Sequence, residues 1–303
     1  MTDILIIGGG AAAMTAALYA SRGGHSVTLI ERSATGGQIA DSPKVENFPG
    51  IPSISGLDLA SKMFDQIVEK GVDCEMDEIH SLEKTENGFI AKGDFGDYEG
   101  KCAILATGVT HRHLGIEGEE KYLGKGVSYC AVCDGPFYTG KRTMVIGDAN
   151  SALQYALMLA KTSTHVDVVT LFDHFFADEA LVSALKKLDN VTITHNMNSV
   201  KFYGDANLKG VLFKNRITGE EKAIETDGCF VAIGQVPDSD RFSSLIELEK
   251  GFILTDESMR TKTPGLFAAG DCRKKKIRQL TTACNDGAIA ALSASAYLSS
   301  QIS

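Results

Sequence analysis

The chain has 303 residues, 44% of them hydrophobic, which is enough for about two domains with sizeable cores. A net charge of −9 argues against a general affinity for nucleic acid or anionic membranes. No apolar run reaches the length of a membrane span, and the N-terminus opens into a short strand rather than a signal sequence, so we expect a cytoplasmic protein. The seven cysteines lack the spacing of a disulfide scaffold, so most should be free thiols.

The N-terminal segment follows the pattern of a dinucleotide-binding unit. Residues 3–7 predict a short apolar strand, and an alanine-rich helix follows. A second strand over residues 26–30 ends at Glu31, where the hydroxyl of a ribose requires an acidic partner. The turn between the first strand and the helix carries the three small residues of a GxGxxA fingerprint: Gly8, Gly10 and Ala13. We therefore favour a true dinucleotide site over a purely structural turn.

The only two cysteines that stand close together are Cys130 and Cys133, in the motif CAVCDG. A zinc half-site would need two more ligands, and no second CxxC or pair of histidines follows at zinc spacing. Buried structural cysteines are a second interpretation. We favour a redox disulfide, because a four-residue span permits closure and Asp134 offers an acid or base beside the sulfurs.

The strand, turn and helix pattern returns immediately after this motif. The expected elements are a strand over 143–146, a turn over 147–152, a helix over 153–161 and a strand over 166–172. Later apolar strands complete the two sheets, and one of them delivers Asp271 at its carboxyl end, where ligands bind in open α/β sheets. The sequence thus predicts an α/β fold with two Rossmann-like, three-layer β/β/α dinucleotide-binding domains, the second inserted in the first.

Several motifs in order carry a resemblance to a known family. They are IIGGGAAA (6–13), GGQI (36–39), VENFPG (45–50), ATG (106–108), CAVCDG (130–135), GLFAAGDC (265–272) and RQLTTACNDGAIAA (278–291). With them, nearly the whole chain resembles the low-molecular-weight thioredoxin reductases, which are two-domain FAD disulfide reductases. The resemblance implies a homodimer, thioredoxin as a partner and no metal.

The resemblance also implies a division of the chain. The FAD-binding domain comprises residues 1–114 and 245–303, and the inserted domain, residues 115–244, carries the CxxC pair. The residues implied at the FAD are Gly8, Gly10, Ala13, Glu31, Gly37, Gln38, Asn47, Thr107, Gly108, Asp271, Arg278, Gln279 and Ala283.

Further implications of the resemblance concern the sulfurs. Cys133 faces the flavin, Cys130 attacks the disulfide of the partner protein, and Asp134 manages the proton. A sulfur pair cannot be buried against a flavin and exposed to a partner protein at once. We therefore expect the inserted domain to rotate on its two connecting strands, near residues 114 and 245.

The second nucleotide unit departs from the resembled family, in which it binds NADPH through an intact turn and a run of arginines. Here Asp148 and Ala149 occupy the turn, and the run after the strand reads Asp173, His174, Phe175. A like charge ~5 Å from a phosphate costs on the order of 3 kcal/mol at an effective dielectric near 20, about 100-fold in binding. We predict weak NADPH binding and a different donor, as in the similar ferredoxin-dependent flavin thioredoxin reductases.

Other interpretations stay open at this stage. The NADPH site could be intact, or NADH could bind with Asp173 on its ribose. A flavin dithiol oxidase and a non-catalytic FAD redox sensor are further candidates. The basic run Arg273, Lys274, Lys275 and Lys276, with Arg278 beyond it, is either a docking face for an acidic ferredoxin or an ordinary solvated surface.

Overall fold

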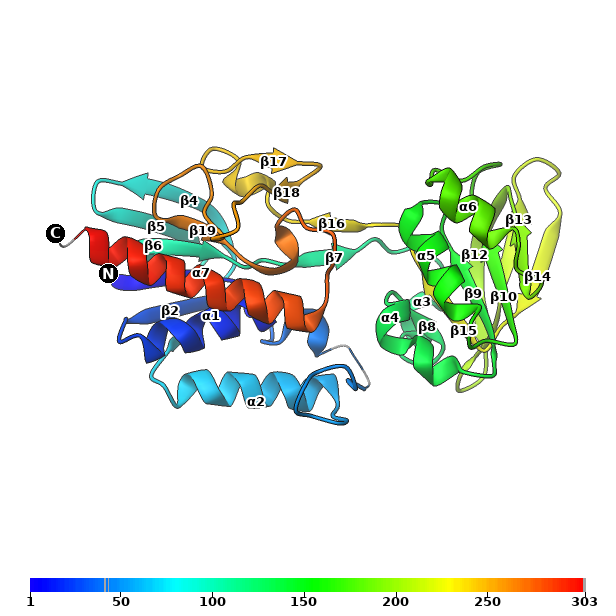
Figure 1. Ribbon diagram of the computed structural model, residues 1–303, viewed down its shortest axis with the longest axis horizontal. Coiled ribbons are helices and arrows are strands. Elements are labelled where there is room, and N and C mark those ends of the chain that lie inside the picture. The colour runs from blue at the N-terminus through cyan, green and yellow to red at the C-terminus, as the bar shows by residue number, and fades with distance from the viewer. Residues whose placement is uncertain (41, 43, 302–303) are drawn as a thin grey trace. The chain divides into compact units, whose positions relative to one another are not determined.

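The computed structural model describes residues 1–40, 42 and 44–301 (Figure 1). The chain divides into two compact units, the first comprising Met1–Thr110 and Val236–Ser303 and the second His111–Gln235. The expected boundaries stood after residues 114 and 244. The two strands that connect the units, β7 (Val109–His111) and β16 (Gln235–Pro237), pair with each other.

A seven-stranded sheet organises the first unit, in the order β3-β2-β1-β6-β5-β4 with β19 also paired to β6. The β1, β2, β3, β6 and β19 neighbours are parallel, and β4, β5 and the start of β6 form an antiparallel meander. Parallel strands covered on both faces read as continuous apolar runs, and Ile4–Ile7 are all buried. The strands are β1 (Thr2–Ile7), β2 (Val27–Glu31), β3 (Asp73–Met76), β4 (Ile79–Thr85), β5 (Gly88–Gly93), β6 (Asp97–Leu105) and β19 (Leu266–Ala268).

The described residues of this unit form three α-helices: α1 (Ala11–Arg22), α2 (Gly56–Val68) and α7 (Leu280–Ser300). Helix α7 runs beside α1 (Figure 1), and small residues on both helices let their backbones approach closely. A Cβ atom added at Gly287 would lie 2.2 Å from the carbonyl oxygen of Ala12. The unit also contains η1 (Gly37–Ile39), η3 (Asp240–Phe242), η4 (Gly270–Cys272), β17 (Leu248–Glu249) and β18 (Phe252–Ile253).

We predict that Gly287→Val destabilises the protein by about 2 kcal/mol, because overpacking forces the helices apart. Chemical denaturation should show a lower transition midpoint. Leu292→Ala is the matched control, because Leu292 is on the same helix and is exposed. An unchanged midpoint for Gly287→Val would show that the helix contact yields without loss.

The second unit has a five-stranded parallel sheet, ordered β11-β10-β9-β15-β8, and a three-stranded antiparallel sheet, β12-β13-β14. Its strands are β8 (Val127–Ser128), β9 (Arg142–Ile146), β10 (His165–Val169), β11 (Val191–Thr194), β12 (Met197–Gly204), β13 (Leu208–Asn215), β14 (Glu221–Glu225) and β15 (Gly228–Val231). Its helices are α3 (Glu119–Tyr122), α4 (Ala131–Asp134), η2 (Gly135–Tyr138), α5 (Asn150–Leu159) and α6 (Glu179–Leu185). The predicted α/β fold with two dinucleotide-binding units is confirmed.

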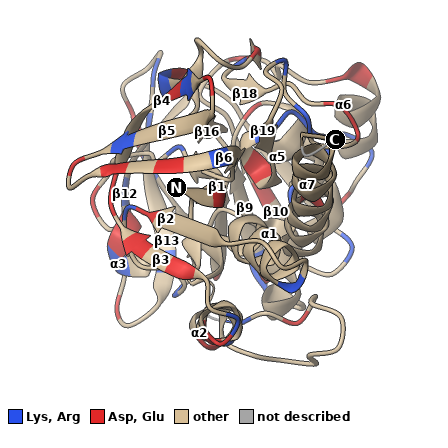
Figure 2. Cartoon of the chain, turned by 90° about the vertical axis from the view of Figure 1, so that its left-hand side faces the viewer, with Lys and Arg blue, Asp and Glu red and all other residues tan. Residues whose placement is uncertain are grey.

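Acidic and basic residues are interspersed along the elements seen in Figure 2. Lys101 pairs with Asp3, and Lys92 pairs with Glu83. None of the helices in the described part of the chain is both long and apolar enough to cross a bilayer.

Candidate active site

The glycine turn of the first unit joins β1 to α1. The N–H of Gly8 donates to Ile30 O (2.8 Å), and a Cβ atom there would lie 2.3 Å from Ala106 O, so only glycine fits. A Cβ at Gly9 would collide with Glu31 at 2.8 Å. A Cβ at Gly10, in contrast, would meet nothing within 4 Å. The turn therefore holds its backbone by packing and leaves open space at Gly10, beside the carboxyl end of β1.

The other residues expected at the FAD belong to the same unit, and contacts link several of them. Gly37 lies against Gly10, and the Gln38 side-chain amide donates to Val109 O. Asn47 contacts Gln279, which caps α7, and Arg278 donates to Asp271 O at 3.3 Å. The remaining ones lie at these places: Ala13 in α1, Glu31 at the end of β2, Thr107 and Gly108 after β6, and Ala283 in α7.

These residues fit a dinucleotide cofactor. The open space at Gly10 is the place where a pyrophosphate approaches the backbone in such turns. The Thr107 hydroxyl is buried and makes no hydrogen bond to another nitrogen or oxygen of the described residues. The Thr107 side chain interacts with the thiol of Cys272, which is a weak partner, so its oxygen can still accept a hydrogen bond from a ligand.

The second unit carries Cys130 and Cys133 as a disulfide, with their Cα atoms 5.3 Å apart. Cys130 precedes the short helix α4, and the N–H of Cys133 donates to Cys130 Sγ at 3.2 Å. A hydrogen bond to sulfur favours its thiolate form once the disulfide is reduced. Both residues are partly exposed. The third cysteine of the second unit, Cys229, is fully buried, and this burial raises the pKa of its thiol.

Asp134 follows Cys133 directly, and burial raises the pKa of its carboxyl. Ser128 Oγ donates to Asp134 Oδ2 at 2.6 Å, which opposes that shift. The other oxygen, Asp134 Oδ1, is buried without a hydrogen-bond partner among the described residues. The carboxyl thus combines an elevated pKa with one uncommitted oxygen, which are properties of a group that transfers protons.

The second glycine turn follows β9, and its first residue obeys the same packing rule as Gly8. A Cβ atom at Gly147 would lie 2.4 Å from Ala232 O. Gly147 is therefore required by the sheet alone. The Cβ of Ala149 occupies the position that is open at Gly10, since Gly10 and Ala149 each precede the first residue of the following helix.

A loop closes over this second turn. Gly10 bridges to Gly36 in the first unit, whereas the corresponding bridge in the second unit joins Ala149 to Phe176. Asn150 and Asp178 exchange two hydrogen bonds, of 3.0 and 2.8 Å. Burial raises the pKa of Asp148 within the turn. Ala149, Phe176 and Asp148 therefore stand at the backbone positions that Gly10, Gly36 and Gly9 hold in the first unit.

The register of the sheets corrects one expectation. Ile7 pairs with Ile30 in the first unit and Ile146 with Val169 in the second, so Thr170 corresponds to Glu31. Asp173 lies three residues further on, exposed and hydrogen-bonded to His174. It does not occupy the acidic ribose position. Strand β10 ends at Val169, earlier than the predicted 172, because the chain turns away at Thr170, whose hydroxyl donates to Phe172 O.

The fold places one cation, Arg216, beside the residues that follow β10, which the sequence did not predict. Arg216, in the connection between β13 and β14, donates to Leu171 O at 3.0 Å and lies over the ring of Phe172. Leu171, Phe172 and Phe176 are exposed around it. The surface after β10 therefore combines exposed apolar side chains with Arg216 and the exposed pair of Asp173 and His174.

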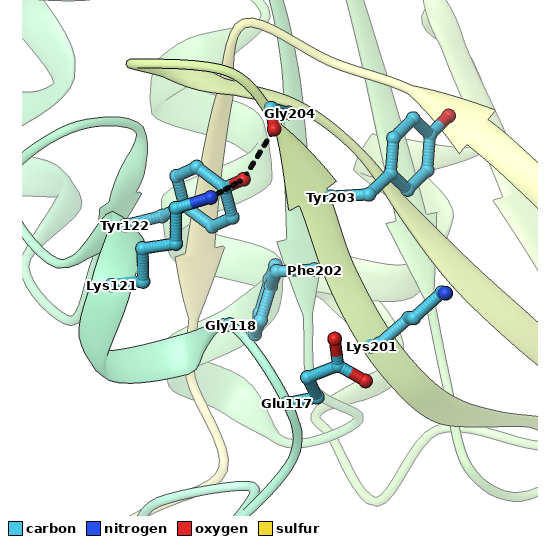
Figure 3. Close-up of a pocket in the computed structure, with 8 residues that line it drawn as sticks. All are labelled: Glu117, Gly118, Lys121, Tyr122, Lys201, Phe202, Tyr203 and Gly204. Atoms are coloured by element: carbon cyan, nitrogen blue, oxygen red, sulfur yellow. Dashed lines mark hydrogen bonds between the residues drawn. The ribbon is translucent and has the colours of Figure 1, made fainter.

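A pocket of about 270 Å³ also lies in the second unit (Figure 3). Lys121 contacts the hydroxyl of Tyr122, which donates to Gly204 O at 2.6 Å. Neither redox cysteine nor Asp134 lines this pocket, so it is separate from the disulfide site.

Comparison with known proteins bears on the whole chain. Residues 2–287 match the family model described as pyridine nucleotide-disulphide oxidoreductase. The chain is 39% identical over 300 residues to the thioredoxin reductase of Bacillus subtilis (strain 168), covering 98% of this chain and 94% of that protein. It is also 39% identical over 300 residues to a 34.2 kDa protein in the rubredoxin operon of Clostridium pasteurianum, covering 98% and 97%. The crystal structure of thioredoxin reductase from Streptococcus pyogenes MGAS5005 has a TM-score of 0.95 at 38% identity and covers 99% of each chain.

The chain belongs to the low-molecular-weight thioredoxin reductase family. Proteins of this family are FAD-binding flavoproteins, in agreement with the open turn at Gly10.

The basic run after Asp271 is not the open patch that the sequence indicated. Arg273 pairs with Asp286 at 3.4 Å, and Lys275 pairs with both Asp271 (2.9 Å) and Asp286 (3.0 Å). The side chains of Arg273 and Lys275 are only 13% and 10% exposed. Lys274 pairs with Glu249, so Lys276 is the one cation of the run without an ion pair among the described residues. The structure gives no support to this run as a ferredoxin-docking face.

Two residues of the candidate site, Ser128 and Arg216, were not predicted from the sequence. Ser128 could have been found from its position two residues before the CxxC motif. Arg216 could not, because no local signal links it to a strand that ends 47 residues earlier at Val169.

Proposed function

We propose that the chain is an FAD-dependent disulfide reductase that delivers electrons to thioredoxin through Cys130 and Cys133. The observation that carries this proposal is the disulfide of a partly exposed CxxC pair, followed directly by the Asp134 carboxyl, whose pKa is raised by burial. Two relatives, from Bacillus subtilis and Treponema pallidum, are named thioredoxin reductases, which supports thioredoxin as the substrate.

The proposed cofactor residues are those that line the first turn and its surroundings. Gly8 and Gly10 admit the pyrophosphate, and Glu31 receives a ribose hydroxyl. Asp271 and Arg278 lie at the carboxyl end of β19. Bound FAD supplies the two electrons that reduce the disulfide.

The electrons then pass from the CxxC pair to thioredoxin by thiol–disulfide exchange. Two electrons and two protons convert the disulfide to a dithiol. The Cys130 thiolate attacks the thioredoxin disulfide, forms a mixed disulfide and releases one thioredoxin thiolate, which takes a proton. The Cys133 thiolate attacks Cys130 Sγ, which restores the disulfide and releases the second thiolate. Asp134 is proposed to hold and transfer the proton through its uncommitted oxygen.

We further propose that NADPH is not the electron donor and that reduced ferredoxin is. Ala149 and Asp148 stand at the positions of Gly10 and Gly9 in the first turn, and Leu171, Phe172 and Phe176 follow β10, where the resembled family has a run of arginines, which supports this proposal. We do not propose the run 273–276 as the docking face for ferredoxin, because most of its cations are already paired.

A pyridine nucleotide is the second candidate donor. The matched family model carries that description, and Arg216 places one cation beside the loop after β10. Because the strand register puts Asp173 outside the position that would contact the ribose, it gives no specific support for NADH as the donor.

The test is an anaerobic titration of the holoenzyme followed by flavin absorbance. We expect bleaching by reduced ferredoxin and not by NADPH or NADH at micromolar concentrations, with dithionite as the positive control. Rapid bleaching by NADPH would overturn the proposed donor. A chemically reduced enzyme that fails to reduce thioredoxin would overturn the proposed substrate. The proposed homodimer is tested separately by sedimentation of the holoenzyme.

A further inference from the structure

Ser128 lies at the centre of the hydrogen bonds around the redox pair. It belongs to the two-residue strand β8 and is 5% exposed. Its oxygen accepts the N–H of Cys130 at 3.0 Å and lies 2.6 Å from Asp134 Oδ2. One hydroxyl group therefore joins the backbone of a redox cysteine to the carboxyl that serves it.

The direction of the Ser128 bond follows from its single proton. Its oxygen also lies 3.5 Å from Cys130 O, but the Asp134 contact is much shorter and has the geometry of a strong O–H···O⁻ bond. The N–H of Asp134 donates to Cys130 O at 3.0 Å. Asp134 is thus tied to the CxxC turn through its backbone and through Oδ2, which leaves Oδ1 as the only free carboxyl oxygen.

We propose that Ser128 is a positioning residue for the disulfide exchange: it holds Asp134 by Oδ2 so that Oδ1 is the oxygen that exchanges a proton with the sulfur pair. This inference rests on the proposed reductase function.

The groups around Asp134 leave the Ser128 hydrogen bond as an important influence on the pKa of this carboxyl. Burial raises the pKa of this carboxyl and the Ser128 bond lowers it, and no charged side chain of the described residues is among the causes of the shift. Titratable groups on the elements packed against α4 are phenols, Tyr138 on η2 and Tyr155 on α5. Burial raises the pKa of Tyr138 to about 12 and also raises that of Tyr155, so both are neutral when Asp134 titrates. Removing the Ser128 hydroxyl should therefore move the Asp134 titration upward.

The test compares Ser128→Ala with the wild-type holoenzyme by NMR of ¹³C-carboxyl-labelled aspartate, using Asp134→Asn to assign the signal. We expect the Asp134 midpoint, and the matching limb of the pH profile for thioredoxin reduction, to move to higher pH in Ser128→Ala. Ser128→Thr, which keeps the hydroxyl, should restore the wild-type midpoint. If Ser128→Ala does not fold, Ser128→Gly carries the same expectation.

Ser163→Ala is the matched control, because Ser163 is another buried serine of this unit, and its hydroxyl accepts a hydrogen bond from Thr143 at 3.0 Å. It should lower stability without moving the Asp134 midpoint. An unmoved midpoint in Ser128→Ala, or an equal shift in Ser163→Ala, would overturn the role of Ser128. A wild-type enzyme that does not reduce thioredoxin would contradict the proposed function instead, and the NMR midpoints would still decide the role of Ser128.

Discussion

Cys130→Ser is expected to abolish thioredoxin reduction while leaving the flavin spectrum intact. Cys130 is partly exposed and its sulfur accepts the N–H of Cys133, so it is the proposed attacking thiolate. A serine hydroxyl at this position is not ionised near neutral pH and cannot form the mixed disulfide. Removal of a catalytic nucleophile commonly lowers turnover by on the order of 10³-fold or more.

The matched variant Cys133→Ser separates the two sulfurs. It should also lose turnover, but its remaining Cys130 thiolate should attack a single-cysteine thioredoxin whose thiol is activated as a mixed disulfide with thionitrobenzoate. Thionitrobenzoate leaves, and the stable enzyme–thioredoxin disulfide is visible on a non-reducing gel. Cys130→Ser should trap none. If the trapped complex forms with Cys130→Ser instead, the proposed roles of the sulfurs are reversed.

Gly10→Asp is expected to produce a folded protein that has lost its FAD. The Gly10 φ angle of −79° suits any residue, and a side chain there meets open space, so the fold should tolerate the change. The carboxylate would face the pyrophosphate. A like charge at ~5 Å costs on the order of 3 kcal/mol at an effective dielectric near 20, which is about a 100-fold loss of affinity.

The isosteric Gly10→Asn variant separates charge from bulk, and flavin content after dialysis is the measurement. Gly10→Asn should retain more FAD than Gly10→Asp, and both should give wild-type far-UV circular dichroism. Full FAD occupancy in Gly10→Asp would show that the pyrophosphate does not approach this turn.

The fold could be predicted because its signals are local and repeated. Each nucleotide unit has an apolar strand, a glycine turn and a helix in sequence, and Gly8 and Gly147 both occupy positions where a Cβ atom would strike a neighbouring strand's carbonyl. The elements around Cys130 and Asp271 could likewise be predicted from the residues next to them in the sequence.

What could not be predicted depends on pairs that are distant in sequence. The ion pairs of Arg273 and Lys275 with Asp286 depend on how α7 packs, which composition does not reveal. The alternative in which Asp173 contacts the ribose of NADH depended on the exact end of a strand, and β10 ends at Val169, before Asp173. Short-range patterns specify elements well but leave their last residues and long-range charge pairs open.

The closure of the second turn by Asn150, Asp178 and Phe176 has a thermodynamic consequence. A protein domain that awaits a coenzyme is stabilised by mass action in proportion to the supply of that coenzyme. Here hydrogen bonds of the chain itself hold the loop, so under the proposed donor an excess of NADPH should leave the unfolding midpoint of the inserted unit unchanged. A midpoint that rises with NADPH concentration would show that this unit binds the coenzyme.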